Sequence, residues 1–163
     1  MEGRHQKAGR NPMTPPRITE AKAIAQRIGA DADDPLPQLA LSVRQPWAWA
    51  IIQAGKDIEN RTWGRPIGRP HGRIAIHAAK GMTRDEYAKA VEFMRVACGV
   101  KCPHIIELDR GGIIGSVELI DIVTASESPW FEGPFGLVLR DPRPCQFIPA
   151  RGMLGFFRWN ETK

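Results

Sequence analysis

Residues 41–63 read LSVRQPWAWAIIQAGKDIENRTW. Three of the five tryptophans of the chain fall in this stretch, beside cations, a carboxylate and an amide. A segment that only fills a core does not need large aromatic rings interleaved with charged groups at such close spacing. We therefore expect residues 41–63 to face a ligand, and we interpret the rest of the chain as their support.

The first half of this stretch predicts a strand followed by a helix. Residues 39–43 form a short apolar run that is typical of a buried strand. Pro46 suits the first turn of a helix, and Gln45 stands near its cap. Gly55 can adopt the left-handed conformation that ends a helix, so we expect this helix to extend from Pro46 to about Ala54.

The second half predicts a strand that carries charged side chains. Residues 57–63 alternate, so Glu59 and Arg61 share one face, and Lys56 stands at the entrance of the strand. This Lys/Glu/Arg cluster beside an aromatic helix is the sharpest candidate site in the chain. The alternative is a mutually satisfied group of ion pairs at a strand edge, an arrangement that is common at protein surfaces.

Length and composition predict one globular domain behind a leader. The 163 residues are enough for a single hydrophobic core, and no apolar run approaches the roughly 20 residues of a membrane helix. No apolar segment follows the basic N-terminus, so we expect a cytoplasmic protein without a membrane partner. Residues 1–38 are rich in proline and lack aromatic residues, which predicts a flexible leader with a short helix near residues 19–28. Residues 39–163 form the expected domain, whose oligomeric state the sequence leaves open.

Charge is concentrated around the opening stretch. Between residues 44 and 80, seven Lys and Arg residues face two acidic residues, within a chain of net charge +5. Cations that meet phosphates and aromatic rings that stack on bases are the features of a nucleic-acid-binding surface. The alternative is a solvated basic face. The arginines of this window include Arg65 and Arg69 in a loop rich in glycine and proline.

The rest of the chain predicts further strands, one clear helix and two weaker site residues. Residues 74–78 predict a strand that places His77 opposite the isoleucines, and residues 113–123 predict a long strand carrying Ser116. The capping box of residues 83–86 predicts a helix with a packing role. We also expect a strand over residues 135–140, a turn over 141–144 and a last strand near 154–159. The loop of residues 126–134 presents Trp130, either to a ligand or as a cover for the barrel end.

Cysteine usage favours neither disulfides nor metal. The chain has three cysteines, and the pattern of Cys98, Cys102 and His104 lacks a fourth ligand at the usual spacing for zinc. We therefore expect no metal and no other cofactor. About five or six strands with interspersed helices predict an α+β fold whose sheet curls into a small barrel.

Several blocks of the sequence together resemble one known family. They are LSVRQPWA at residues 41–48, the Gly55-Lys56-x-x-Glu59-x-Arg61 motif, GRIAIHA at 72–78 and GSVELI at 115–120. This pattern resembles the ASCH domain, named for homology to activating signal cointegrator-1, in the PUA-like superfamily. The resemblance implies a small β-barrel with surrounding helices and binding of RNA or DNA in a cleft. In that family one residue usually separates the glycine from the lysine, whereas here the two adjoin.

The same resemblance leaves an enzymatic alternative. Some bacterial relatives hydrolyse a modified cytidine, with a threonine where this chain has Glu59. Others are described as ribonucleases that depend on the motif lysine, a preceding tyrosine and a later serine. Here the only tyrosine, Tyr87, follows the motif, and Ser116 or Ser126 are the candidate serines.

The sequence therefore predicts a nucleic-acid-binding domain, with RNA favoured over DNA. The alternative is a ribonuclease or nucleoside amidohydrolase in which Lys56 is the catalytic base or nucleophile and Glu59 orients it or shuttles protons. The candidate binding residues are Arg44, Gln45, Trp47, Lys56, Glu59, Arg61, Arg73, His77, Lys80, Ser116 and Trp130.

Overall fold

Helices are interspersed among the strands of the described chain, which comprises residues 35–62 and 72–161 of this computed structural model. The elements are β1 (Leu39–Val43), α2 (Trp47–Gln53), β2 (Ile58–Arg61), β3 (Gly72–Ala78), α3 (Arg84–Ala97), the 3-10 helix η1 (Ile105–Glu107), β4 (Gly112–Val123), β5 (Phe135–Pro149) and β6 (Phe156–Arg158). The expected strand at residues 39–43 is confirmed. The expected helix is confirmed from Trp47 onward, and Gly55 follows it with a φ of 72°.

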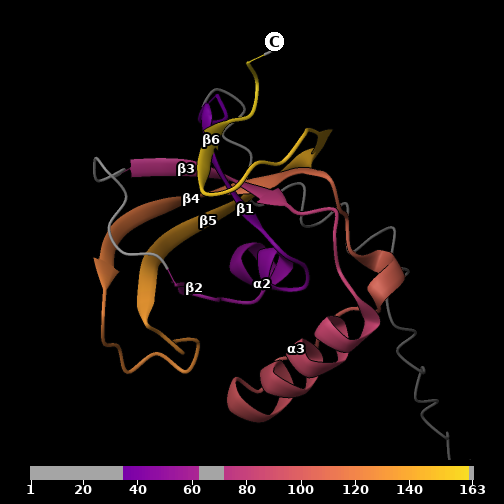
Figure 1. The fold of residues 1–163 in the computed structure, drawn as a ribbon, viewed down its shortest axis with the longest axis vertical. Coiled ribbons are helices and arrows are strands. Elements are labelled where there is room, and N and C mark those ends of the chain that lie inside the picture. The colour runs from indigo at the N-terminus through magenta and orange to yellow at the C-terminus, as the bar shows by residue number, and fades with distance from the viewer. Residues whose placement is uncertain (1–34, 63–71, 162–163) are drawn as a thin grey trace, which may run out of the picture. The chain divides into compact units, whose positions relative to one another are not determined.

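The strands form one six-stranded sheet in the order β2-β5-β4-β3-β1-β6. Strands β1 and β3 pair in parallel, and the other neighbouring strands are antiparallel. The long strands β4 and β5 bend around α2, as Figure 1 shows. This curled sheet with its helices confirms the expected α+β fold whose sheet curls.

The two end strands of the sheet, β2 and β6, leave it open in the described part of the chain. The side chain of Arg61 in β2 reaches across to the backbone carbonyl of Ser42 in β1. The end strand β2 therefore lies close to β1, the neighbour of the other end strand. We call this junction, where β2 meets β1, the seam.

The concave face of the sheet is filled by α2. Apolar residues of β1, β3, β4 and β5 pack against the helix in one buried cluster, which contains Leu41, Val43, Ala48, Ile51, Ile52, Ile74, Ile76, Ala78, Val117, Leu119, Leu137 and Leu139. A second cluster on the other face contains Ala40, Ala75, Ile113 and Phe157. Alternate residues of β3 belong to different clusters, as the alternation of a strand requires. This confirms that His77 lies opposite the isoleucines.

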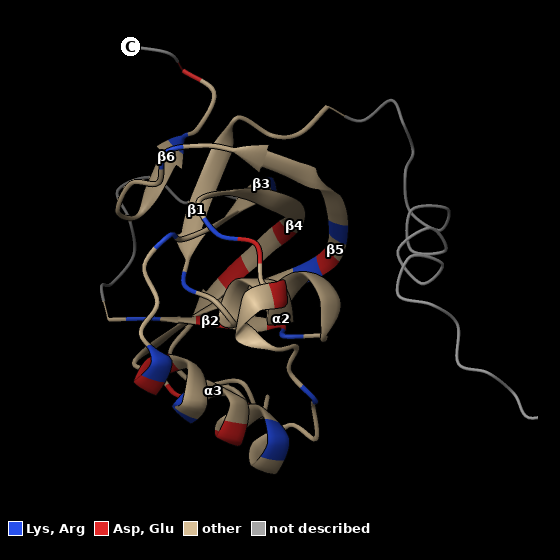
Figure 2. Ribbon diagram, turned by 90° about the vertical axis from the view of Figure 1, so that its right-hand side faces the viewer, with Lys and Arg blue, Asp and Glu red and all other residues tan. Residues whose placement is uncertain are grey.

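Helix α3 begins at the predicted capping box. The Thr83 hydroxyl accepts a hydrogen bond from the Glu86 backbone N–H at 3.1 Å, and the Glu86 carboxylate accepts one from the Thr83 N–H at 2.8 Å. Met94 of this helix is fully buried in a third cluster with Ala50, Ile58 and Trp130. The expected packing role of α3 is therefore confirmed. Charges of both signs follow one another along its exposed side (Figure 2).

The turn expected at residues 141–144 is wrong, because strand β5 continues through it. An extra residue is absorbed there as a bulge, since Ser116 pairs with Arg143 while Glu118 pairs with Arg140. Asp141 adopts a φ of 48° at this point. Strand β2 covers β5 only from Phe135 to Val138, so the prolines that follow lie where no ladder to β2 is interrupted.

Other expectations concern segments beyond this description. The leader helix at residues 19–28 and the arginine-bearing loop with Trp63, Arg65 and Arg69 lie outside the described residues. Among residues 35–62 and 72–161, no helix has the length and apolar character needed to cross a membrane.

Candidate functional site

The predicted Lys/Glu/Arg cluster forms at the seam. The Lys56 ammonium lies 2.9 Å from the Glu59 Oε2 and also donates to the backbone carbonyl of Ile58. Arg61 lies 3.3 Å from the other carboxylate oxygen of Glu59, and it donates to the Ser42 carbonyl at 2.9 Å. The expectation that Glu59 and Arg61 share a face is confirmed. The alternative interpretation was a group of mutually satisfied ion pairs at a strand edge, and the ion pairs of Glu59 with Lys56 and Arg61 agree with it as well.

The cations of this cluster differ in their access to solvent. The Lys56 side chain is only 2% exposed, whereas the Arg61 side chain is 19% exposed. The Lys56 ammonium also lies 5.8 Å from the centre of the Trp47 ring, within range of a cation–π contact. Lys56 therefore makes its contacts inside the protein, whereas Arg61 is the cation of the cluster that is partly exposed to solvent.

Trp47 and Arg44 flank the cluster at the end of β1. The Trp47 ring meets Phe93 edge-on with ring centres 5.7 Å apart, and the residue remains partly exposed. Arg44 is exposed and forms an ion pair with Glu86 in the first turn of α3. Surface pairs of this kind contribute little stability, so a phosphate can replace the carboxylate at low cost.

The sheet brings Ser42 next to His77, a neighbour that the sequence did not reveal. Their α-carbons are direct partners in the parallel pairing of β1 with β3. The Ser42 Oγ lies 3.0 Å from His77 Nδ1, and His77 Nε2 lies 2.9 Å from the Ala150 carbonyl oxygen. Through the Ser42 carbonyl, this pair is linked to Arg61. The seam thus joins the predicted cluster to His77 through a serine that no local motif marks.

Arg73 and Ser116 form a separate cluster on the same face of the sheet as His77. Arg73 donates to the Ser116 hydroxyl and to the Asp141 carbonyl, each at 3.1 Å, and also pairs with the Asp141 carboxylate. Four residues of strand separate Arg73 from His77, which corresponds to about 13 Å. Arg73 and Ser116 therefore lie together, but away from the seam.

Three other predicted residues do not join either cluster. Trp130 is 5% exposed and packs in the core cluster with Met94, so its ring belongs to the core. Gln45 is buried, where it donates to the Asp109 carbonyl at 2.8 Å and accepts from the Trp49 N–H at 2.9 Å. Lys80 is exposed in the segment that follows β3.

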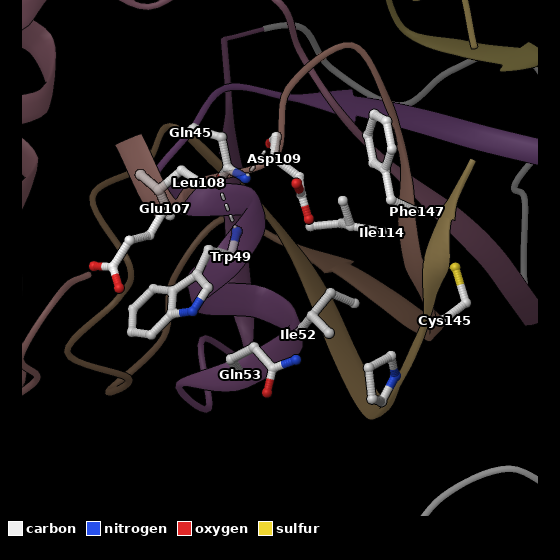
Figure 3. Close-up of a pocket in the computed structure, with 11 residues that line it drawn as sticks. Gln45, Trp49, Ile52, Gln53, Glu107, Leu108, Asp109, Ile114, Cys145 and Phe147 are labelled. Carbon is white, nitrogen blue, oxygen red and sulfur yellow. Dashed lines mark hydrogen bonds between the residues drawn. The ribbon is translucent and has the colours of Figure 1, made fainter. Parts of the chain in front are cut away.

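A pocket of about 120 Å³ lies on another side of α2. Figure 3 shows its lining by Trp49 and Ile52 of α2, Ile114 of β4 and residues of β5 that include Cys145 and Phe147. The acidic residues Glu107 and Asp109 also line it. Their negative charge disfavours phosphate, so this pocket is a poor candidate for binding nucleic acid.

The described residues offer no metal centre. No group of three or more histidine, cysteine and acidic side chains in residues 35–62 and 72–161 is arranged to hold a metal ion. Burial raises the pKa of the Cys102 and Cys145 thiols, which disfavours the thiolate form that binds metals.

Comparisons with known proteins agree on one family. The family model described as the ASCH domain matches residues 41–133. Human activating signal cointegrator 1 is 28% identical over 112 residues, which are 63% of this chain and 19% of that protein. The chain thus spans about a fifth of the length of this curated relative. Two crystal structures of an ASCH protein from Zymomonas mobilis, one of them a mutant, share 23% identity and a TM-score of 0.38 over 68% of this chain and 72–74% of theirs.

Proposed function

The chain belongs to the ASCH domain family, and from this premise we propose that it binds nucleic acid at the seam, with RNA preferred over DNA. The observation that carries the proposal is the charge of the seam cluster. Lys56 and Arg61 face the single carboxylate of Glu59, so these three side chains have a net charge of +1. Because Lys56 is buried, the surplus favours anions at the Arg61 side of the cluster.

Arg61 has the chemistry and the geometry of a phosphate ligand. A guanidinium group presents several N–H donors in a planar fork that matches phosphate oxygens. Contacts with Glu59 and with the Ser42 carbonyl already hold the side chain in one orientation. Less conformational entropy is therefore lost when a phosphate binds.

Two neighbours complete the proposed interface. The exposed Arg44 offers a second cation at the end of β1. Trp47 is partly exposed and offers a ring on which a base can stack, an interaction that contributes about 1–3 kcal/mol per base. Trp130, Gln45, Arg73 and Ser116 are not part of this proposed interface.

The alternative of hydrolysis by Lys56 has less support. A lysine that acts as base or nucleophile must reach the substrate in its neutral form. The Lys56 ammonium instead donates to Glu59 and to the Ile58 carbonyl, and its side chain is almost fully buried. These contacts favour a structural role for Lys56.

We expect Arg61→Gln to weaken RNA binding about tenfold, because one phosphate contact is lost. The slope of the logarithm of the binding constant against the logarithm of the salt concentration should also become shallower by about one, since about one counterion fewer is released. Fluorescence anisotropy with a labelled single-stranded RNA at several salt concentrations measures both effects. The same titration with DNA of matching sequence tests the preference for RNA.

The matched control is Arg95→Gln. Arg95 is an exposed arginine in the last turn of α3 that also pairs with a carboxylate, that of Glu92. This variant should bind RNA as the unmodified protein does. Equal losses in the two variants would instead mean that only the net charge matters, and the seam would no longer be the proposed interface.

A further inference from the structure

The two hydrogen bonds of His77 favour one tautomer of a neutral imidazole ring. A backbone carbonyl can only accept a hydrogen bond, so the contact with the Ala150 carbonyl oxygen places the ring proton of a neutral imidazole on Nε2. His77 Nδ1 then presents a lone pair, and the hydroxyl of Ser42 donates to it at 3.0 Å. This is the arrangement of a serine nucleophile next to its general base.

The ring of His77 is also fixed by packing. His77 is 2% exposed, and its ring meets Phe157 edge-on with ring centres 5.7 Å apart. Gly152 covers the ring so closely that a β-carbon at this position would lie 2.5 Å from the His77 Cε1. Ser42 itself remains partly exposed. A buried base that packing holds in place next to the Ser42 hydroxyl suits nucleophilic attack, because little reorganisation is needed.

We propose that Ser42 and His77 form a catalytic dyad that hydrolyses acyl esters, with Ser42 as the nucleophile and His77 as the general base. The Ala150 carbonyl has the role of the third member of a serine hydrolase triad with the two ring nitrogens exchanged, because it binds Nε2 and fixes the tautomer and the orientation of the ring. It brings no full negative charge, so we expect turnover slower than that of a triad with a carboxylate.

The chemical steps balance with water as the only co-substrate. The Ser42 Oγ forms a bond to the carbonyl carbon of the ester while its proton moves to His77 Nδ1. When the tetrahedral intermediate collapses, the bond from carbon to the alcohol oxygen breaks, and the leaving alcohol takes that proton. Water then attacks the acyl-serine and gives a proton to His77, which returns it to the Ser42 oxygen. The products are a carboxylic acid and an alcohol.

The position of Arg61 indicates the kind of ester. Its guanidinium lies 2.9 Å from the backbone carbonyl oxygen of Ser42, so Arg61 can hold a phosphate near the residue that carries the nucleophile. We therefore assign as substrate an acyl ester whose alcohol is a phosphorylated ribose, as in an acylated nucleotide or RNA end. This part of the inference rests on the proposed binding of nucleic acid at the seam, whereas the dyad does not.

A fluorophosphonate probe tests the dyad directly. The Ser42 oxygen should displace fluoride from phosphorus, and mass spectrometry of the intact protein and its peptides should show one label, on Ser42. Labelling should be lost in Ser42→Ala and should slow about tenfold or more in His77→Gln, which lacks the base. Ser116→Ala is the matched control, because Ser116 is a serine of the same sheet that bonds to Arg73 instead of a histidine. An unlabelled wild-type protein, or equal rates in His77→Gln, would overturn the proposal and leave Ser42 a structural partner of His77.

A second assay separates the dyad from the substrate assignment. The hydrolysis of an O-acetylated nucleoside monophosphate and of uncharged p-nitrophenyl acetate is compared in Arg61→Gln. We expect kcat/KM to fall about tenfold for the phosphorylated ester only. A fall for both esters, or for neither, rejects the assigned substrate. RNA affinity measured on the same preparations shows whether nucleic-acid binding stands, since binding without Ser42 labelling rejects the dyad alone.

Discussion

Lys56→Met is expected to lower the free energy of unfolding by about 3 kcal/mol, because it removes one partner of a buried ion pair. Methionine has an unbranched side chain of similar length to that of lysine but cannot neutralise Glu59. The Glu59 carboxylate then retains Arg61 at 3.3 Å, which is why the expected loss lies at the lower end for such pairs. Urea denaturation followed by circular dichroism measures the change.

A second lysine provides the control for this prediction. Lys89 pairs with Asp85 on the surface of α3, where the two side chains are 78% and 77% exposed, so Lys89→Met should cost no more than about 1 kcal/mol. The double variant Lys56→Met/Glu59→Met should recover part of the loss, since no buried charge is left without its lysine. A different result would contradict the structural role of Lys56. If Lys56→Met is as stable as Lys89→Met but loses a hydrolytic activity, Lys56 is a catalytic residue.

Features that local sequence determines were predicted correctly. The capping box at Thr83 is a contact between residues three apart, and the common face of Glu59 and Arg61 follows from the alternation of any strand. The end of α2 at Gly55 follows from the freedom of glycine to adopt positive φ. Each of these signals is complete within a few residues.

The partners that define the seam could not be predicted in this way. Ser42 and His77 are 35 residues apart, and their contact depends on the register of a parallel pair whose crossover includes α2 and β2. A shift of one residue would turn the side chains to opposite faces. The burial of Trp130 also depends on tertiary structure, because a tryptophan in a loop with glycine and proline is typical of an exposed site.

We expect Trp130→Ala to lower the free energy of unfolding by about 3–5 kcal/mol, the cost of removing a large ring from a core. The ring is 5% exposed and packs with Ala50, Ile58 and Met94, with the ring of Phe93 at a centre-to-centre distance of 6.4 Å. The loss is measured by urea denaturation, and incomplete folding of the variant at room temperature agrees with the prediction.

Trp130→Phe separates packing from stacking on a base. Asn60 holds the loop through its backbone, because its side chain donates to the Trp130 carbonyl and accepts from the N–H groups of Glu132 and Gly133. These bonds do not involve the indole, so the loop should keep its conformation in this variant. A phenylalanine fills most of the same space, and we expect a folded protein with unchanged RNA affinity. Stable folding combined with a loss of affinity of about tenfold would return Trp130 to the interface, because base stacking would then be its role.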